Sequence, residues 1–344
     1  SIAVSHGVKE DGKSRVYTVS LSGGVPRLIT PLAPSYLHGW SPDGKTLAYC
    51  AERNGEFDVY TISAEGGVET RLTDAPGLND GPEYDSAGEY IWFNSVRSGL
   101  MQAWRMKANG TEQTQMTFDE NWNTWFPHIS PDRTKVVMIA YKKGDVAPGE
   151  HVPHKYVELR LMNADGSDLK TIVELFGGQG TINVNSWSPD SKKVASCKIR
   201  PVEKRYVYYV ESSPSDQLQP KLHKQEYAKP GDELPFKIPC IYDVETGHSV
   251  IPSTDLFSQQ YYITAPEWNS DSQAITFEYN QRGHQVYRVL EFSAATGKVR
   301  PLIEETSDKY VNYSRRFRHD LQNGKRMIWM SERDNWNHLY ICLL

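Results

Sequence analysis

The sequence of 344 residues is poor in features that would mark a membrane or nucleic-acid protein. It has no apolar run long enough to cross a bilayer as a helix, so we expect no membrane insertion. The formal net charge of −5 gives no reason to expect nucleic acid as a partner. The first residues, Ser1 to Ser5, carry no basic segment, so no signal peptide is predicted and the compartment stays open.

Catalytic motifs are also missing. No Gly-x-Ser-x-Gly nucleophile elbow occurs, and Ser41 and Ser188 are each followed by Pro-Asp, which places them in turns. We therefore expect no catalytic residue, no bound metal and no cofactor. The four cysteines lack a C-x-x-C pair, and we predict that they are small buried residues and not disulfides or ligands: Cys50, Cys197, Cys240 and Cys342.

What the sequence does contain is a repeated turn motif, which is the strongest signal for its fold. The motif is clearest at Trp40-Ser-Pro-Asp-Gly44 and Trp187-Ser-Pro-Asp190, and weaker copies begin near residues 84, 129, 268 and 318. Pro presets φ, Asp bonds the local backbone and Gly takes positive φ, so each copy predicts a tight turn. A run rich in aromatic and β-branched residues follows, which favours a strand.

The spacing of the copies predicts the architecture. A repeat of roughly 40–50 residues with about four strands per unit is typical of a propeller blade. We therefore predict an all-β protein, a single β-propeller over residues 1–344 with seven blades, within a range of six to eight. Residues 1–30 lack a first strand and the last blade lacks a fourth, so both terminal blades are predicted to be incomplete. Such edges would favour self-association, and the sequence leaves open how the ring closes.

Polar and aromatic residues precede several of the repeated turns. If these segments form the innermost strands, they converge on one mouth of the channel and would bind a small ligand or a peptide. The alternative is that they cap strand ends and bind channel water. The candidates are His38, Asp80, Asn123, Trp125, His128, Asn183 and Asn185.

Three further features have weaker interpretations. His151 and His154 are spaced like half of a metal site, but they fall in a segment rich in Pro and Gly, which predicts a solvated loop. Glu304-Glu305 is predicted to be a solvated strand end. A metal-dependent lyase or hydrolase with His38 and His128 as ligands is an alternative function.

The first part of the chain resembles the TolB-like family of propellers, over roughly residues 1–190. The residues that carry the resemblance are Trp40–Gly44, Phe57–Tyr60, Thr70–Thr73, Trp125–Asp132 and Val157–Met162. These motifs are specific to a fold and not to a function.

From about residue 187 onward the chain is similar to the N-terminal propeller of the dipeptidyl peptidase IV family of serine peptidases. The matching stretches are Pro220–Tyr227, Lys229–Pro235, Ile241–Gly247 and Lys325–Tyr340. The resemblance implies a propeller that restricts access to a peptidase site, yet the sequence has neither the hydrolase domain nor, in residues 1–187, the family's substrate-gripping Glu-Glu motif.

The two resemblances meet at a motif that both families share, with TolB-like blades in residues 1–190 and peptidase-like blades in residues 191–344. Two origins stay open: a recombinant of the two families, natural or engineered, and one divergent member that kept a generic repeat. The function that we predict is a non-catalytic scaffold or ligand-binding ring, with an access-gating peptidase propeller as the alternative. Both resemblances imply a periplasmic or secreted bacterial origin.

Overall fold

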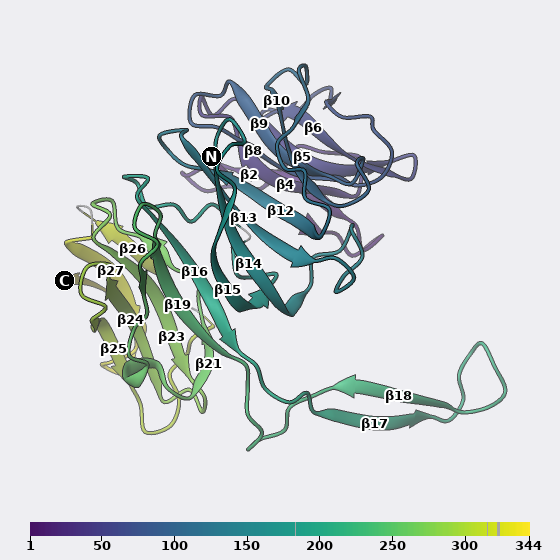
Figure 1. Ribbon diagram of the computed structural model, residues 1–344. Coiled ribbons are helices and arrows are strands. Elements are labelled where there is room, and N and C mark those ends of the chain that lie inside the picture. Colours follow the sequence, from purple (N-terminus) through teal and green to yellow (C-terminus); the bar gives the residue numbers. More distant parts are fainter. Residues whose placement is uncertain (183, 315, 322–323) are drawn as a thin grey trace. The chain divides into compact units, whose positions relative to one another are not determined.

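The computed structural model describes residues 1–182, 184–314, 316–321 and 324–344, and it consists of strands almost throughout (Figure 1). The predicted all-β fold is confirmed. In the described part of the chain the one helical element is the 3₁₀ helix η1 (Asp255–Phe257), and no helix is long and apolar enough to span a membrane. The chain divides into two compact units. The first contains residues 1–197 and 241–249, and the second contains residues 198–240 and 250–344.

The first unit is built from antiparallel sheets that follow one another along the chain. A three-stranded sheet comes first and three four-stranded sheets follow, each with its strands in sequence order. The strands are β1 (Ile2–Gly7), β2 (Ser14–Val19) and β3 (Arg27–Leu28); β4 (Ser35–Trp40), β5 (Thr46–Arg53), β6 (Glu56–Ser63) and β7 (Thr70–Arg71); β8 (Asn79–Tyr84), β9 (Tyr90–Ser95), β10 (Gln102–Lys107) and β11 (Thr114–Gln115); β12 (Trp122–Ile129), β13 (Lys135–Lys142), β14 (Pro153–Asn163) and β15 (Lys170–Gly178).

The core of the first unit lies between successive sheets. Strands such as β5 and β13 are buried on both faces, which explains why they are apolar runs and not alternating patterns. One cluster packs Val59 of β6 against Ile91 and Phe93 of β9, and the next packs Trp92 of β9 against Met138 of β13. Each fully buried side chain of this kind contributes about 1.5–3 kcal/mol of transfer free energy, so stacked sheets stabilise one another.

The repeated turn has the predicted geometry. Ser41 Oγ donates to Asp43 Oδ1 at 2.6 Å, Asp43 Oδ1 also accepts the Lys45 N–H at 3.0 Å, and Gly44 has a φ of +68°. The same serine–aspartate bond of 2.6 Å recurs in the copies at residues 130–132 and 188–190. Arg133 and Ser191 take the positive φ where the motif has no glycine.

Copies of the turn from successive sheets lie next to each other. Ser86 Oγ donates to the Pro131 carbonyl at 2.8 Å, and the Asp132 N–H donates to Ser191 Oγ at 3.0 Å. Gly88 has a φ of +70°, and a Cβ there would lie 3.3 Å from Pro42 Cδ. The motif therefore joins neighbouring sheets as well as forming a hairpin within each one.

A second repeated contact holds the end of each of the first three sheets. Three buried threonines make this contact: Thr30, Thr73 and Thr117. Each hydroxyl accepts a backbone N–H from the next-to-last strand of its sheet, which is β2, β6 or β10, at 2.8–2.9 Å. Thr73 also donates to the buried Asp58 at 2.7 Å, and Thr117 donates to Gln102 at 2.7 Å. A buried threonine thus takes the place of a ladder bond where the last strand of each sheet ends.

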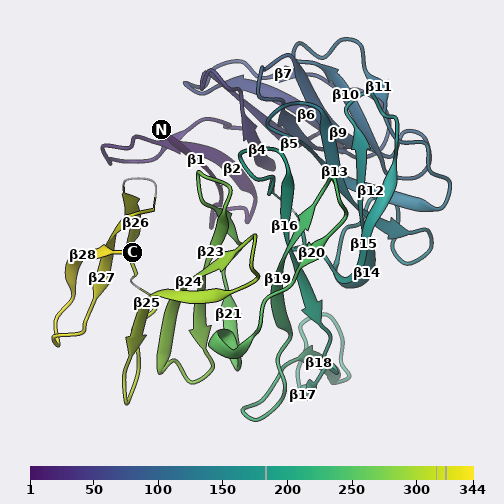
Figure 2. The ribbon, with the colours of Figure 1, turned by 60° about the vertical axis from the view of Figure 1, so that its left-hand side comes forward.

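The second unit contains a sheet with a divided first strand and a three-stranded sheet. In the first of these, β21 (Gln260–Ile263) and β22 (Glu267–Trp268) both pair with β23 (Ala274–Gln281), followed by β24 (Val286–Ser293) and β25 (Val299–Thr306). The other contains β26 (Arg318–Leu321), β27 (Arg326–Ser331) and β28 (His338–Leu343). Figure 2 shows these two sheets side by side, and a cluster with Tyr287, Met327 and Trp329 packs between them.

Glu305 corrects one expectation from the sequence. It is not at a solvated strand end: its side chain is buried in β25, where it accepts the Trp329 Nε1–H at 2.9 Å and the Ser331 hydroxyl at 2.8 Å and pairs with Arg333. The neighbouring Glu304 is exposed and pairs with Arg288. Strand alternation places the two carboxylates on opposite faces of the sheet.

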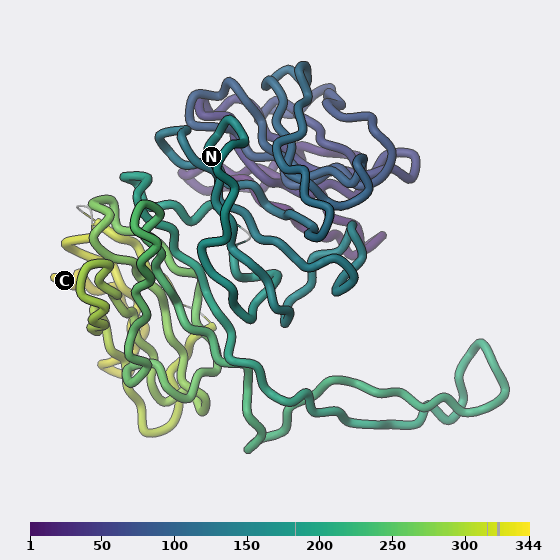
Figure 3. Tube along the Cα trace, viewed as in Figure 1, coloured from purple at the N-terminus to yellow at the C-terminus, as the bar shows by residue number. Residues whose placement is uncertain are grey.

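The Pro- and Lys-rich stretch after residue 200 folds in part as a hairpin. β17 (Tyr206–Glu211) pairs with β18 (Lys221–Glu226) in a two-stranded sheet that extends away from the rest of the second unit (Figures 1 and 3). Neither strand contains a buried residue. The hairpin interrupts a three-stranded sheet formed by β16 (Lys193–Arg200), β19 (Phe236–Asp243) and β20 (Ser249–Val250), and the boundary between the two units falls within all three strands.

The described residues therefore form seven sheets besides the β17–β18 hairpin, and the first and last have three strands, as the repeat predicts for incomplete blades. All four cysteines lie in the described part of the chain. None of them forms a disulfide, and Cys50, Cys197 and Cys240 are buried, whereas Cys342 is half-buried. That the whole chain closes as a single propeller stays a prediction.

Candidate functional site

The candidate site forms where the first strands of three successive sheets meet. β8 contacts both β4 and β12, and each of the three strands carries a β-bulge at a corresponding place. The residues that leave the ladder are His38, Gly81-Pro82 and Phe126-Pro127. Bulges redirect side chains, and here they direct them toward two neighbouring cavities of about 830 and 320 Å³.

His38 and Asp80 form the polar centre of the larger cavity. His38 Nε2 lies 3.1 Å from Asp80 Oδ1, and the same oxygen accepts the Gly81 N–H at 2.7 Å. Burial opposes the charge of Asp80, but His38 and the Gly81 N–H outweigh burial and lower the pKa of this carboxyl group to about 2. Gly81 has a φ of +65°, and a Cβ there would lie 3.1 Å from Asn94 Oδ1, so the bulge requires glycine.

The remainder of the larger cavity wall is mainly apolar and aromatic. An apolar wall of this kind binds the body of a ligand by burying it, while a few polar groups orient the ligand. The lining includes Tyr36, Leu37, Phe57, Leu78, Phe126 and Val184, together with Ser5, Cys50, Gly149 and Gln179. Burial raises the pKa of the Cys50 thiol well above its ordinary value, so this thiol is neutral and unreactive.

His151 also lines the larger cavity, which overturns the expectation of a solvated loop. Its ring packs against Trp125 and Phe126, with centroids at 4.5 and 5.0 Å. Burial lowers the pKa of His151, which favours the neutral imidazole. His154, three residues later, instead stacks on Phe176 at 6.3 Å, so the two histidines do not form half of a metal site.

His128 and Asn185 belong to the smaller cavity and meet at Glu83. His128 Nδ1 lies 2.6 Å from Glu83 Oε2, and Asn185 Nδ2 donates to Glu83 Oε1 at 2.7 Å. The other imidazole nitrogen, Nε2, lies 3.1 Å from the Ile182 carbonyl. This network joins β8 and β12 to the segment that precedes Trp187.

The remaining candidates have other locations. Asn123 is fully buried, and its side-chain oxygen accepts the Met101 N–H at 3.0 Å, so it fixes the start of β12. Trp125 is fully buried behind Phe126 and His151, and like Asn123 it lines neither of the two cavities in the described structure. Asn183 lies outside the described residues.

The placement of the histidines bears on the metal alternative. His38 and His128 each pair with a different carboxylate, Asp80 and Glu83. His38 lines both cavities, whereas His128 lines the smaller one and not the larger one. Among the residues that the structure describes, no three His, Cys, Asp or Glu side chains are grouped as metal ligands.

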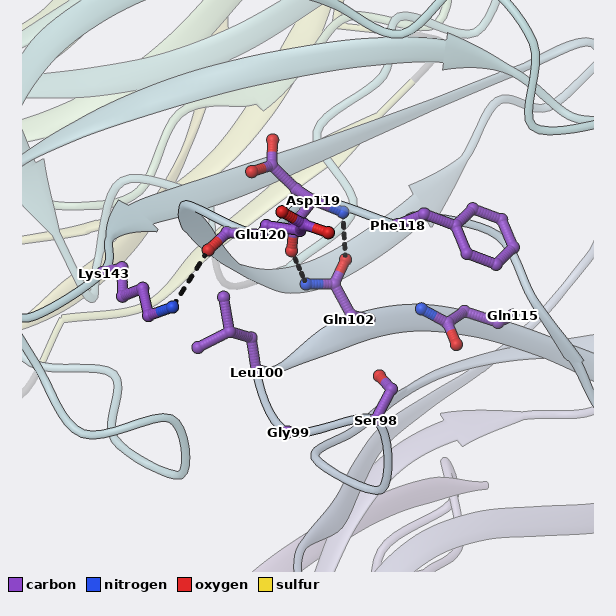
Figure 4. Close-up of a pocket in the computed structure, with 9 residues that line it drawn as sticks. All are labelled: Ser98, Gly99, Leu100, Gln102, Gln115, Phe118, Asp119, Glu120 and Lys143. Carbon is purple, nitrogen blue, oxygen red and sulfur yellow. Dashed lines mark hydrogen bonds between the residues drawn. The ribbon is translucent and has the colours of Figure 1, made fainter.

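A further pocket of about 620 Å³ lies elsewhere in the first unit, and Figure 4 shows its lining. Gln102 donates to the Asp119 carbonyl at 3.0 Å and Lys143 Nζ donates to the Glu120 carbonyl at 3.3 Å. The exposed ring of Phe118 lies on the side opposite Lys143. The Gln102 amide holds the 117–122 segment in place, which is a structural role.

Sequence reasoning missed Phe126, Glu83 and His151. A signal for the bulges was present, because Gly39, Gly81-Pro82 and Pro127 interrupt strands where such residues mark a bulge. The role of His151 had no local signal, since it reaches the cavity from a loop far from β4 and β8 in the sequence.

Sheets of three or four antiparallel strands, linked by one repeated turn, define a β-propeller protein. The family follows from comparison with known proteins. Residues 10–151 match the TolB beta propeller domain, and residues 180–344 match the dipeptidyl peptidase IV N-terminal region. A solved structure from Agrobacterium tumefaciens, assigned to TolB, is 46% identical, and the match covers 58% of this chain and 70% of that one with a TM-score of 0.53. The chain therefore belongs to the TolB-like propeller family, and its second half carries a dipeptidyl peptidase IV N-terminal region.

Two further comparisons define how far these likenesses reach. An uncharacterized protein of Agrobacterium fabrum is 46% identical over 194 residues, which are 56% of this chain and 65% of that protein, slightly less than two thirds of its length. The structure of Porphyromonas gingivalis dipeptidyl peptidase 4 is 14% identical, with 89% of this chain and 45% of that chain covered and a TM-score of 0.58. At that identity the likeness concerns the fold alone.

Proposed function

We propose that this chain is a non-catalytic propeller that binds a small ligand or a peptide in the larger cavity of its first unit. The observation that carries the proposal is the coincidence of three bulges with one cavity. The bulge residues His38 of β4 and Phe126 of β12 line it, and so does Asp80, which directly precedes the bulge of β8. A bulge costs ladder hydrogen bonds, so three at one place favour a shaped site over a packing accident.

The size and lining of the cavity support binding over a purely structural role. A volume of about 830 Å³ falls within the range of about 300–1,000 Å³ that is usual for ligand sites. Aromatic and aliphatic side chains form most of its wall, and His38 and Asp80 supply a small polar centre. This combination binds the body of a ligand by burial and fixes its orientation by hydrogen bonds.

A blocked cavity tests the proposal. A library of neutral fragments and short apolar peptides would be screened by the rise in melting temperature, and the hits would be titrated by calorimetry. Val184→Trp should weaken the hits at least about tenfold, because this exposed residue borders the cavity. Val68→Trp, at an exposed position of the first unit outside the cavity lining, is the matched control. Hits that bind Val184→Trp normally would contradict the proposal.

A second candidate function is an access-gating propeller that acts only with a hydrolase domain. The match of residues 180–344 to the dipeptidyl peptidase IV N-terminal region favours it. The chain alone should then release no nitroaniline from dipeptidyl p-nitroanilides, because the sequence has no nucleophile elbow. Turnover that co-purifies with the chain would show a catalytic site that neither candidate includes.

The origin and location of the chain are also proposals. A join of two propeller families near residue 190 is supported by the two family matches, which do not overlap. A relative that matches one of these families over both stretches would contradict the join. Export to the bacterial cell envelope is what membership of the TolB-like family implies, and fractionation of the source cells would test it.

Self-association through the terminal sheets is a further proposal. β28 lies at the edge of its sheet, and Leu339, Ile341 and Leu343 are exposed on it. β1 is the edge strand at the other end of the chain, with Ile2 exposed. Unpaired apolar edges favour pairing between chains. Light scattering should give a mass above that of the monomer of 39.1 kDa, and a strict monomer at high concentration would contradict the proposal.

A further inference from the structure

The charges on the larger cavity wall are unevenly distributed. Asp80 is a carboxylate, and neither lysine nor arginine is among the described residues that line the cavity. Burial keeps His151 and the Cys50 thiol in their neutral forms. His38 can at most balance the charge of Asp80, so with His151 neutral the described lining carries no excess of positive charge. An anionic ligand would find no fixed cation to pair with it.

Aromatic rings line the same cavity as this carboxylate. Tyr36, Phe57 and Phe126 all line the same cavity, and the bulge in β12 brings Phe126 to it. The face of an aromatic ring attracts a cation within about 6 Å of its centroid, and the attraction strengthens as the cation is desolvated. Several rings together with one carboxylate therefore favour a cation over a neutral group of the same shape.

The cavity is also much larger than a single ammonium group. Its volume of about 830 Å³ and its aliphatic residues Leu37, Leu78 and Val184 leave room for an apolar body next to the charged head. A ligand that fills the cavity therefore needs both parts. The apolar part supplies most of the binding free energy through burial, and the cationic part supplies selectivity.

We propose that the larger cavity selects organic cations, namely an alkyl- or arylammonium group on an apolar body, with Asp80 and the rings of Tyr36, Phe57 and Phe126 recognising the charge. The inference rests on the proposed function, because it assigns a ligand class to the same cavity. It goes further in requiring that the sign of the ligand's charge matters.

The test uses choline, its uncharged isostere 3,3-dimethylbutan-1-ol, and benzyltrimethylammonium, each titrated into the full chain by calorimetry. Choline should bind at least about tenfold more tightly than the isostere, and benzyltrimethylammonium should bind more tightly than choline because it also fills the apolar part. The ratio of the choline and isostere affinities is measured within each protein sample, so it does not depend on the fraction that is correctly folded.

Two variants locate the selectivity. Asp80→Asn should reduce the choline-to-isostere ratio to less than about threefold, and Tyr36→Leu should reduce it by a smaller factor. Tyr36 is 43% exposed, so its variant tests the inference even if Asp80→Asn melts early. Glu112→Gln, at an exposed turn outside the cavity lining, is the control that removes a carboxylate without changing the ratio.

The outcomes separate this inference from the proposed function. Equal affinity for choline and its isostere, or a ratio that neither cavity variant changes, would overturn cation selectivity while leaving ligand binding intact. If no cation binds but neutral probes do, the inference fails alone. If neither cations nor neutral fragments bind, both proposals fail.

Discussion

The two units use the same repeated turn and reach different degrees of regularity. In the first unit, the turns that begin near residues 40, 84 and 129 are almost evenly spaced, and each spacing accommodates one four-stranded sheet. After residue 129 the spacing widens, and a hairpin without buried residues interrupts the sheet of β16, β19 and β20, within which the boundary of the units falls. In the second unit the first strand of one sheet is divided into β21 and β22. Even spacing places equivalent residues of successive first strands together, and that is the condition for a shared site.

Both units also contain a buried carboxylate that holds neighbouring strands. In the first unit Asp58 accepts the Thr73 hydroxyl at 2.7 Å and the Asn79 amide at 3.0 Å. In the second unit Glu305 accepts the Trp329 and Ser331 side chains at 2.9 and 2.8 Å. The two carboxylates lie at different places in their sheets, because β6 is followed by β7 whereas β25 is the last strand of its sheet. The units therefore share a type of contact and not an equivalent position.

The largest expected effect compares two buried tryptophans. Trp329 donates to the buried Glu305, whereas Trp125 Nε1 has no hydrogen-bond partner in the described structure. Trp329→Phe should therefore lower the free energy of unfolding by about 1.5–3 kcal/mol more than Trp125→Phe, because it also removes a bond to a charged group. Urea denaturation of both variants measures the difference. Equal losses would show that the bond to Glu305 adds nothing beyond ring packing.

An intermediate effect concerns acid stability of the first unit. Folding lowers the pKa of Asp80 from its ordinary value of 3.8 to about 2, so the folded state binds fewer protons than the unfolded state over this range. The contribution of Asp80 is therefore fully present above about pH 4 and is lost as the pH falls toward 2, with a total of about 2 kcal/mol. The difference in unfolding free energy between wild type and Asp80→Asn, followed from pH 6 to pH 2, should narrow by this amount. A constant difference would mean that the His38–Asp80 pair does not stabilise the ionised carboxyl group.

The smallest effect should come from the hairpin of the second unit. Replacement of residues 208–224 by an Asn-Gly turn keeps the Val207–Gln225 pair and removes the exposed end. The strands contain no buried residue, so the free energy of unfolding should change by less than about 0.5 kcal/mol. The contrasting control is deletion of Phe57–Val59 from β6. This strand also belongs to an antiparallel hairpin, but it contains buried residues. A marked loss on hairpin replacement would show that the arm packs against other residues.

The sequence was sufficient for the strands and insufficient for the site. The turn motif predicted β5, β9 and β13 closely, because Ser-Pro-Asp interactions are local and each motif is followed by an apolar run. The site depends on bulges at His38, Gly81-Pro82 and Phe126-Pro127, where the alternation of inward and outward side chains changes. Alternation alone could therefore not show that Asn123 is structural or that Phe126 lines the cavity.

Long-range contacts were the other limit. His151 reaches Trp125 and Phe126 from a loop between β13 and β14. Glu83 joins His128 to Asn185, although Glu83 and Asn185 are 102 residues apart in the sequence. No local pattern encodes such distances. The burial of Glu305 was missed for the same reason, because its partners Trp329 and Ser331 lie two strands later in the chain.

The most direct test of the central claim, that ligand recognition belongs to the cavity of the first unit, is hydrogen–deuterium exchange with and without the tightest ligand found in the titrations, whether a neutral fragment or benzyltrimethylammonium. We predict slower exchange in residues 36–40, 78–84 and 149–151, which border that cavity, and unchanged exchange in residues 250–344. Protection confined to residues 250–344, or protection nowhere in the chain, would contradict the claim.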